Sequence, residues 1–359
     1  MPTGPDDGAR LSAQTIDLVI EAELIMLRRV RDSLAKGIET PAWVEAKLLE
    51  LQRLRRDLTA DLSALNVALA AEVERVVGLA YTTGSALAVG DLDDAGIRPG
   101  LPRGQFAAVQ VIARDVIATI QGVAPVALRS VADAYQAVVA EATGTVLMGA
   151  STRVEAAQAA LDRLLGDGIP GFTDAAGRNW RLESYIEMAV RTGTGQAAMR
   201  GHVDTLAASG HDLVYVIPGP RACPDCDQWS GRVLSISGAT SNVIVDGARL
   251  DVAALDAVRG SGHLFGPNCR CTQGLYLPGI TTPQTERPDP AGYAAGQEQR
   301  RLERGVRGWK RREELALTPE ARRAAQAKVR EWQSRLREHL VAHPDLKRLP
   351  RREQISRAI

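Results

Sequence analysis

Cysteine is scarce in this sequence, and long uninterrupted apolar runs are absent. Four cysteines in 359 residues are too few for a secreted scaffold held together by disulfides. The longest apolar run, from Phe106 to Val126, is interrupted by Arg114 and Asp115, so we expect no membrane-spanning helix. The first residues, M-P-T-G-P-D-D-G, lack the basic and apolar regions of a signal peptide. We therefore expect a soluble protein that folds in a cytosol and does not contact a membrane.

The common catalytic motifs are also missing. The sequence has no phosphate-binding loop, nucleophile elbow, H-E-x-x-H helix or carboxylate cluster suited to two metal ions. Of its five histidines, His202 and His211 flank a predicted helix end, where histidine usually caps the helix or forms surface hydrogen bonds. We therefore predict that the protein is not an enzyme.

Hydrophobic periodicity predicts a helical first half. Apolar residues from Ile16 to Leu34 form one stripe, which predicts a helix capped by Ser12 and ended by Gly37. Thr40-Pro41 then starts a long helix with an apolar seam over 44–76. Such a seam is compatible with a coiled coil between two copies or with a bundle inside the chain, and we favour the bundle.

Four further helical segments follow a predicted loop over residues 90–102. Two alanine- and valine-rich segments predict helices at 106–122 and 126–144. Thr152 and Glu155 have the spacing of a capping box and predict a helix that runs to about Leu165. Residues 182–208 are also helical in pattern, with a bend or break predicted at Gly193 and Gly195.

A small β-rich module is predicted after residue 208. Strands are indicated at 213–217 and 232–237, and a hairpin at 243–250 turns at Asp246-Gly247. A last strand is expected within 272–278. A proline-rich linker over 281–296 then leads to C-terminal helices, which Thr318-Pro319 divides in two.

All four cysteines lie in or beside this module. Cys223 and Cys226 form a C-x-x-C pair, and Cys269 and Cys271 form a C-x-C pair, with His263 as a further nitrogen ligand. Any four of these five residues suit a structural zinc ion. The same spacing also fits a redox motif, local disulfides or free packed thiols, and on an extended chain the two sulfurs of C-x-C point to opposite sides.

The end of the chain is strongly basic. Residues 299–359 contain 18 Lys and Arg and 8 Asp and Glu, a net charge of +10, whereas the rest of the chain carries −9. This tail predicts non-specific contact with DNA phosphates, or docking on the protein's own acidic body or on an acidic partner. The DNA-contact candidates are Arg307, Lys310, Arg311, Arg312, Arg322, Arg323, Lys328 and Arg330.

Several long strings in the second half resemble one known family. They are F-T-D-A-A-G-R-N-W-R-L-E-S-Y-I-E-M-A-V-R-T, C-P-D-C-D-Q-W-S-G-R-V-L-S-I-S-G and L-F-G-P-N-C-R-C, and the basic R-L-E-R-G-V-R-G-W-K-R-R is similar as well. Over about residues 168–332 the chain resembles the phage minor capsid protein 2 family and, more distantly, MuF-type head-morphogenesis proteins.

The resemblance implies a virion structural protein, assembled in the host bacterial cytoplasm and placed near the portal vertex. Its implied partners are the portal and other capsid proteins, with oligomerisation through the N-terminal helices as a further expectation. The alternative is a MuF-type protein that carries a toxin or nuclease activity. Two positions depart from the family pattern: Gly266 replaces a usual histidine, and Cys271 stands where histidine is common. His263 is a substitute ligand for the first.

The expected fold class is α+β and predominantly α, with an N-terminal helical bundle, a small β-rich cysteine module and C-terminal basic helices. The expected divisions are a helical region at 1–167, a minor-capsid core with the cysteine module at 168–280, a linker at 281–298 and a basic helical tail at 299–359.

Overall fold

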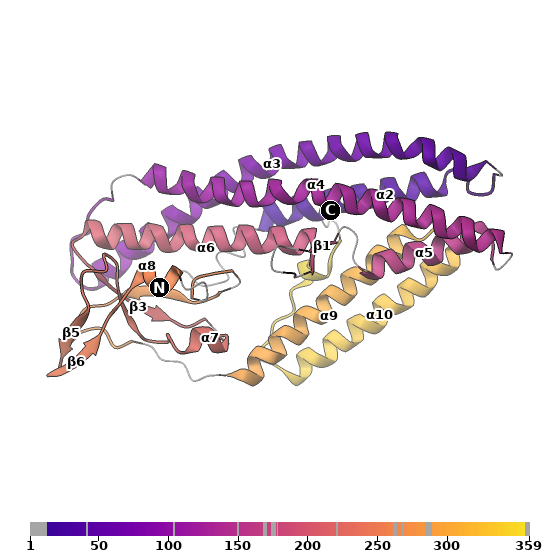
Figure 1. Cartoon of the computed structure of the whole chain (residues 1–359). Coiled ribbons are helices and arrows are strands. Elements are labelled where there is room, and N and C mark those ends of the chain that lie inside the picture. Colours follow the sequence, from indigo (N-terminus) through magenta and orange to yellow (C-terminus); the bar gives the residue numbers. More distant parts are fainter. Residues whose placement is uncertain are drawn as a thin grey trace. The chain divides into compact units, whose positions relative to one another are not determined.

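The computed structural model (Figure 1) describes residues 13–40, 42–102, 105–148, 151–167, 171–173, 177, 179–219, 222–260, 264–267, 269–283 and 289–355. The described chain is predominantly α-helical with a small β-rich region, which confirms the predicted fold class. Helices lie at both ends of the described chain, as the hydrophobic periodicity indicated. The predicted cap Ser12 lies outside the described residues.

The chain forms two compact units that each combine distant segments. Unit 1 takes its described residues from Met1–Thr15, Leu69–Thr119 and Glu187–Ala294. Unit 2 takes its described residues from Ile16–Ala68, Ile120–Ile186 and Ala295–Ile359. Residues of the helical first half therefore occur in both units, and the four segment boundaries expected from the sequence remain a prediction.

Five helices lie between residues 13 and 208 of the described chain. They are α2 (Ala13–Ala35), α3 (Trp43–Asp94), α4 (Gln105–Leu147), α5 (Arg153–Asp167) and α6 (Leu182–Ala208). Gly37 has φ of +66° directly after α2, which confirms the predicted stop. The capping box of α5 is also confirmed, because Glu155 N–H donates to Thr152 Oγ1 and Thr152 N–H donates to the Glu155 carboxylate.

Neither of two predicted helix interruptions appears as a break in the structure. The helices predicted at 106–122 and 126–144 form one continuous helix, α4, with Pro125 inside it. Residues 182–208 also form one helix, and Gly193 lies in close packing, since a Cβ there would come within 2.3 Å of Val116 Cγ2. At Gly193, tertiary packing has therefore outweighed the local preference of glycine to interrupt a helix.

Glycine brings α3 and α6 into direct backbone contact in unit 1. A Cβ at Gly84 would lie 1.8 Å from the carbonyl oxygen of Ala198, and one at Gly201 would lie 2.1 Å from that of Tyr81. No side chain fits at either position. The same contact is tied by a hydrogen bond of 2.8 Å from the Tyr81 hydroxyl to Asp204. Close approach, and not a turn, explains these two glycines.

The continuous α4 has one property that the sequence reading did not expect. Among the described helices, its stretch Phe106–Gly144 is long and apolar enough to cross a membrane by length and composition, with a mean hydropathy of 1.5. Only 25% of its most apolar 18-residue window is buried. A core helix of a soluble protein passes the same test, so this stretch is weak evidence for a membrane span.

The β-rich module lies in unit 1. A four-stranded sheet has the order β7 (Ala253–Ala254), β4 (Val233–Ser235), β3 (Leu213–Ile217) and β8 (Thr272–Leu275). The hairpin of β5 (Asn242–Val245) and β6 (Ala248–Asp251) turns at Asp246 and Gly247, as predicted. Helix α8 (Leu255–Gly260) follows, and β1 (Gly171–Thr173) and β2 (Asn179–Arg181) form a separate pair in unit 2.

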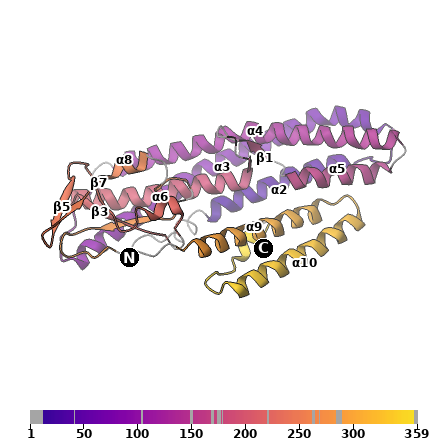
Figure 2. The same cartoon turned by 60° about the horizontal axis from the view of Figure 1, so that its bottom comes forward.

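Two long helices and a short 3₁₀ helix end the described chain in unit 2. Helix α9 (Pro290–Leu315) and helix α10 (Pro319–Ala342) lie side by side in both views, followed by η1 (Pro350–Glu353) (Figures 1 and 2). Thr318 caps α10 by accepting a hydrogen bond from Ala321 N–H, as predicted. Helix α9 begins at Pro290, within the segment predicted as a linker.

Candidate functional site

The C-x-x-C pair forms a tight turn in unit 1. Cys223 precedes the one-turn helix α7 (Pro224–Asp227), and its carbonyl accepts hydrogen bonds of 3.0 Å from the N–H groups of Cys226 and Asp227. This turn buries Cys226 to 1% exposure in the core of the module, while Cys223 stays half-buried against the same core.

Three of the four cysteines come together in space. The sulfurs of Cys226, Cys269 and Cys271 all lie within 4.8 Å of one another, and those of Cys226 and Cys269 are 3.5 Å apart. None of the four cysteines forms a disulfide in the described structure. Cys223 is not a member of the three-sulfur cluster, and His263 lies outside the described residues.

A turn in the chain allows both sulfurs of the C-x-C pair to join this cluster. The Cys269 N–H donates to the Gly266 carbonyl at 3.1 Å, and Phe265 has φ of +60°. The chain therefore turns before the pair, and the sulfurs of Cys269 and Cys271 lie within 4.8 Å of each other instead of on opposite sides of the chain. At Gly219 a Cβ would lie 2.5 Å from the Arg270 carbonyl oxygen. The backbone at Gly219 therefore lies close to the residue between Cys269 and Cys271.

Hydrogen bonds favour the thiolate form of Cys269. It accepts them from the thiols of Cys226 and Cys271 and from the backbone N–H groups of Cys271 and Phe265, and these lower the pKa of Cys269. The hydrogen bond that Cys226 donates to this thiolate raises the pKa of Cys226. Backbone N–H groups directed at a sulfur stabilise a thiolate whether it is free or bound to a metal.

The cluster fits a tetrahedral metal ion. Zinc–sulfur bonds of about 2.3 Å place the sulfurs of a tetrahedral site about 3.8 Å apart. The Cys226–Cys269 separation of 3.5 Å is close to this value, and all three sulfurs lie within 4.8 Å of one another. The described residues therefore bring together three thiols that could bind one metal ion.

The predicted DNA-contact residues of α9 are not all at the surface. Arg307 and Arg311 are buried at 8% and 5% exposure. Arg311 pairs with Glu23 and Glu183, and Arg307 pairs with Glu183 at 3.0 Å. Naming these two arginines as DNA contacts is wrong for this structure, because buried guanidinium groups held by internal carboxylates cannot reach a phosphate.

Two further α9 candidates are engaged within unit 2. Lys310 Nζ donates to Gln354 at 3.0 Å, and half-burial lowers the pKa of this lysine. Arg312 donates to the Asp162 carbonyl at 3.1 Å and stacks 4.3 Å from the centre of the Trp309 ring. Both side chains thus stabilise the packing of α9.

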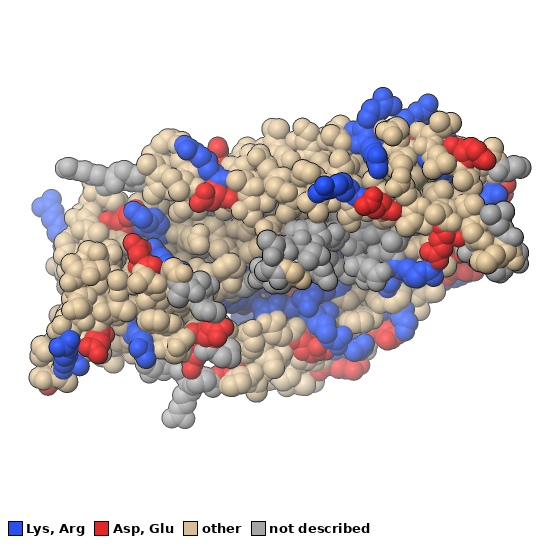
Figure 3. Space-filling view, viewed as in Figure 1, with Lys and Arg blue, Asp and Glu red and all other residues tan. Residues whose placement is uncertain are grey.

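The candidates on α10 have a different environment. Arg322, Arg323, Lys328 and Arg330 are all exposed. Arg323 pairs with Glu320 and Lys328 pairs with Glu331, each three residues away. Figure 3 shows basic and acidic side chains interspersed in the region of α9 and α10.

Arg337, which was not among the predicted DNA-contact residues, is exposed and lies seven residues from Arg330. Heptad spacing, which puts 323, 330 and 337 on one face, is the signal that would have identified it.

Comparison with known families identifies the chain. The family model described as "Phage minor capsid protein 2" matches residues 5–341, nearly the whole chain. The chain belongs to the phage minor capsid protein 2 family. No curated protein and no solved structure matches it. As a minor capsid protein, it is a bacteriophage structural protein of the virion that interacts with other phage proteins.

In this minor capsid protein His202 has a structural position. The sequence reading placed it near a helix end at the surface, but it lies within α6 at 4% exposure, with Nε2 3.0 Å from Asp91. Asp91 also accepts the backbone N–H of Leu275 in the edge strand β8. The pair therefore covers a sheet edge, which would otherwise present unpaired groups.

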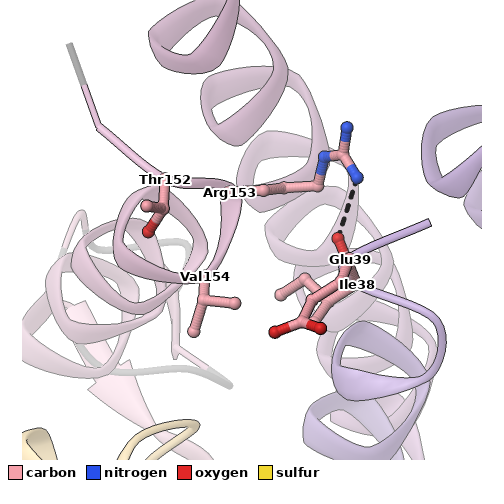
Figure 4. Close-up of a pocket in the computed structure, with 5 residues that line it drawn as sticks. All are labelled: Ile38, Glu39, Thr152, Arg153 and Val154. Atoms are coloured by element: carbon pink, nitrogen blue, oxygen red, sulfur yellow. Dashed lines mark hydrogen bonds between the residues drawn. The ribbon is translucent and has the colours of Figure 1, made fainter. Parts of the chain in front are cut away.

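A surface pocket of the minor capsid protein lies in unit 2 (Figure 4). Ile38, Glu39, Thr152, Arg153 and Val154 line it. The Arg153 guanidinium donates to the carbonyl oxygens of Ile38 and Thr40, at 2.9 and 2.6 Å. These bonds hold the start of α5 against the turn after α2. The Arg153 guanidinium in the pocket therefore stabilises the packing of two helices.

Proposed function

We propose that this minor capsid protein acts near the portal vertex of a tailed phage or prophage and that α10 contacts packaged or translocating DNA without reading its sequence. The observation that carries the proposal is the division of the basic tail into two parts. Buried carboxylates hold Arg307 and Arg311 of α9, whereas the basic side chains of α10 are exposed.

The arginine stripe of α10 suits a phosphate backbone. Arg323, Arg330 and Arg337 recur every seventh residue, which spaces them about 10 Å apart along the helix. Guanidinium groups bind phosphate through two parallel hydrogen bonds. Contacts of this kind position a protein on DNA but carry no sequence information.

Titration with random duplex DNA at several salt concentrations tests this proposal. Replacing Arg323, Arg330 and Arg337 with glutamine should weaken binding and reduce the slope of log affinity against log salt by about 2 to 3, since each lost phosphate contact removes about 0.9. Point variants are preferable to deletion of the tail, because deletion would leave Glu23 and Glu183 without Arg311.

A matched control separates local contact from net charge. Arg53, Arg56 and Arg129 are exposed on α3 and α4, so their triple glutamine variant removes the same charge elsewhere. The control should keep the slope of the unmodified protein. Equal slopes for the α10 variant and the unmodified protein would contradict contact through this stripe.

The position in the virion is tested independently of DNA binding. Immunogold labelling of purified particles should mark one vertex of each head, the one where the tail is attached. Label spread evenly over the shell would contradict a role near the portal.

We further propose that the partners are the portal and other capsid proteins, and that the N-terminal helices contribute to oligomer contacts. We also propose that the protein assembles in the bacterial cytoplasm and has no catalytic activity.

We also propose that the cysteine cluster binds one structural zinc ion. Cys226, Cys269 and Cys271 would supply three ligands, and Cys223 or His263 would supply the fourth. Two features support this assignment: the sulfur separations suit a tetrahedral site, and backbone N–H groups already face Cys269. A cytoplasm keeps thiols reduced, which favours metal binding over a disulfide. Bound zinc would tie α7 to the loop before β8.

A further inference from the structure

The β5–β6 hairpin of unit 1 presents an open strand edge. Its outer strand β6, Ala248–Asp251, is exposed at all four residues, and among the described strands it pairs only with β5. Figure 1 shows the hairpin extending beyond the four-stranded sheet. An isolated two-stranded hairpin is marginally stable in water, and an uncovered edge is a template for another strand.

The hairpin register determines which backbone groups are free. Antiparallel pairs alternate between hydrogen-bonded and non-hydrogen-bonded residues. Val252 N–H donates to Ser241 O at 2.9 Å, so the even-numbered residues 248, 250 and 252 direct their N–H and C=O groups toward β5. The N–H and C=O groups of Arg249 and Asp251 therefore face the open edge.

We propose that β6 pairs antiparallel with β6 of a second copy of this chain, with Leu250 opposite Leu250 of the second copy. In this register Arg249 of each chain lies opposite Asp251 of the other. Arg249 and Asp251 are also the residues whose backbone groups face the open edge. Each Arg249–Asp251 pair across the contact would therefore be both a hydrogen-bonded backbone pair and a pair of opposite charges.

Other registers are disfavoured by charge. Centring the pairing on Arg249 places two arginines opposite each other, and centring it on Asp251 places two aspartates opposite each other; like charges in such positions are destabilising. The two side chains carry opposite charges two residues apart on one face of β6, with Arg249 Nε 3.3 Å from the Asp251 carboxylate. The strand is thus self-complementary about Leu250, as a two-fold symmetric contact requires.

Burial of apolar side chains adds to this pairing. Leu250 is 37% exposed in the single chain. A non-hydrogen-bonded pair brings its two side chains close together, so Leu250 of each copy would cover the other. The result is a four-stranded antiparallel sheet, β5-β6-β6-β5, built from two chains by strand addition.

Charge-swapped variants test the contact in the full-length protein. Arg249→Asp gives a chain with two aspartates on β6, and Asp251→Arg gives a chain with two arginines. Each variant alone should self-associate at least about tenfold more weakly than the unmodified protein, because both charge pairs become repulsive. An equimolar mixture should restore association as a one-to-one heterodimer, and so should the double variant with itself.

Sedimentation velocity at concentrations up to about 100 μM measures this, since an interface of this size is weak. Restored association in the mixture excludes misfolding as the reason that single variants fail. An unmodified protein that stays monomeric throughout, as it would if β6 paired with a different virion protein, overturns the proposal. Single variants that associate as well as the unmodified chain overturn it too, and would assign self-association to another surface.

Discussion

Arg311 and Glu183, which lie 128 positions apart in the sequence, form an ion pair in the interior of unit 2. Glu23 of α2 lies on the same guanidinium at 3.2 Å, and Arg307 shares Glu183. One buried charge cluster thus joins α2, the first turn of α6 and α9. Removing one member of such a cluster leaves its partners buried without full compensation, which costs more than losing a surface pair.

The first prediction concerns this cluster. Glu183→Gln should lower the free energy of unfolding by about 3–5 kcal/mol, because Arg307 and Arg311 both lose a charged partner. Urea unfolding measures the change. Glu298→Gln, which breaks an exposed pair with Arg301, is the control and should cost less than about 1 kcal/mol. Similar small losses in the two variants would show that the buried cluster contributes little.

The second prediction compares two glycines of α3. Gly84→Ala should destabilise the protein by several kcal/mol, on the order of other overpacking substitutions, because the new Cβ would meet the Ala198 carbonyl. Gly78→Ala has no heavy atom within 4 Å of its Cβ and should stabilise the helix by up to about 1 kcal/mol. Thermal melting distinguishes the two signs, and destabilisation by both would contradict the close contact.

The third prediction concerns pH. Partial burial alone would raise the pKa of Asp212, but hydrogen bonds that its carboxylate accepts from Ser235, the Ser237 N–H and Thr240 outweigh this effect and lower the pKa to about 2. Since the folded pKa lies below the unfolded value of 3.8, the stabilisation is complete above about pH 4 and is lost as pH falls through 2.

Asp212→Asn should therefore cost on the order of 1–2 kcal/mol at neutral pH, after allowance for partial solvent exposure. The difference from the unmodified protein should shrink between about pH 4 and 2, as measured by urea unfolding at each pH. Asp246→Asn, an exposed turn position, is the control. A cost that is independent of pH would show that Asp212 acts through packing alone.

The fourth prediction concerns the metal. Protein purified without chelator should contain about one zinc per chain, and chelation should lower the melting temperature because binding is coupled to folding. Cys226→Ser and Cys269→Ser should each abolish zinc binding. Comparing Cys223→Ser with His263→Ala identifies the fourth ligand. Less than about a tenth of an equivalent in the unmodified protein would contradict the site.

Local sequence signals accounted for much of the fold. The stop at Gly37, the capping box at Thr152, the Asp246-Gly247 turn and the cap at Thr318 depend on neighbouring residues only, and the structure contains all four. Predictions failed where a distant segment decides the outcome. Gly193 packs against Val116, so it does not break α6.

For the candidate sites, too, sequence patterns indicated the local features but not the contacts between distant segments. The cysteine spacing indicated which thiols were available, but it could not show that the two sulfurs of the C-x-C pair lie together with that of Cys226, which comes from a segment 43 residues away. In the tail, the number of charges could not show that Arg311 is buried and Arg330 is exposed. Arg311 is buried against Glu23 and Glu183, whose carboxylates come from helices far away in the sequence.

The interleaving of segments in unit 2 has a consequence for synthesis on the ribosome. Glu23 leaves the exit tunnel early, but Arg311 follows it 288 residues later. At about 5–20 residues per second, this interval lasts roughly 15–60 s, during which α2 has only part of its final surroundings. A nascent chain interrupted before α9 would therefore hold acidic side chains without their counter-charges, and we expect cellular proteases to remove such fragments before they can enter a growing phage head.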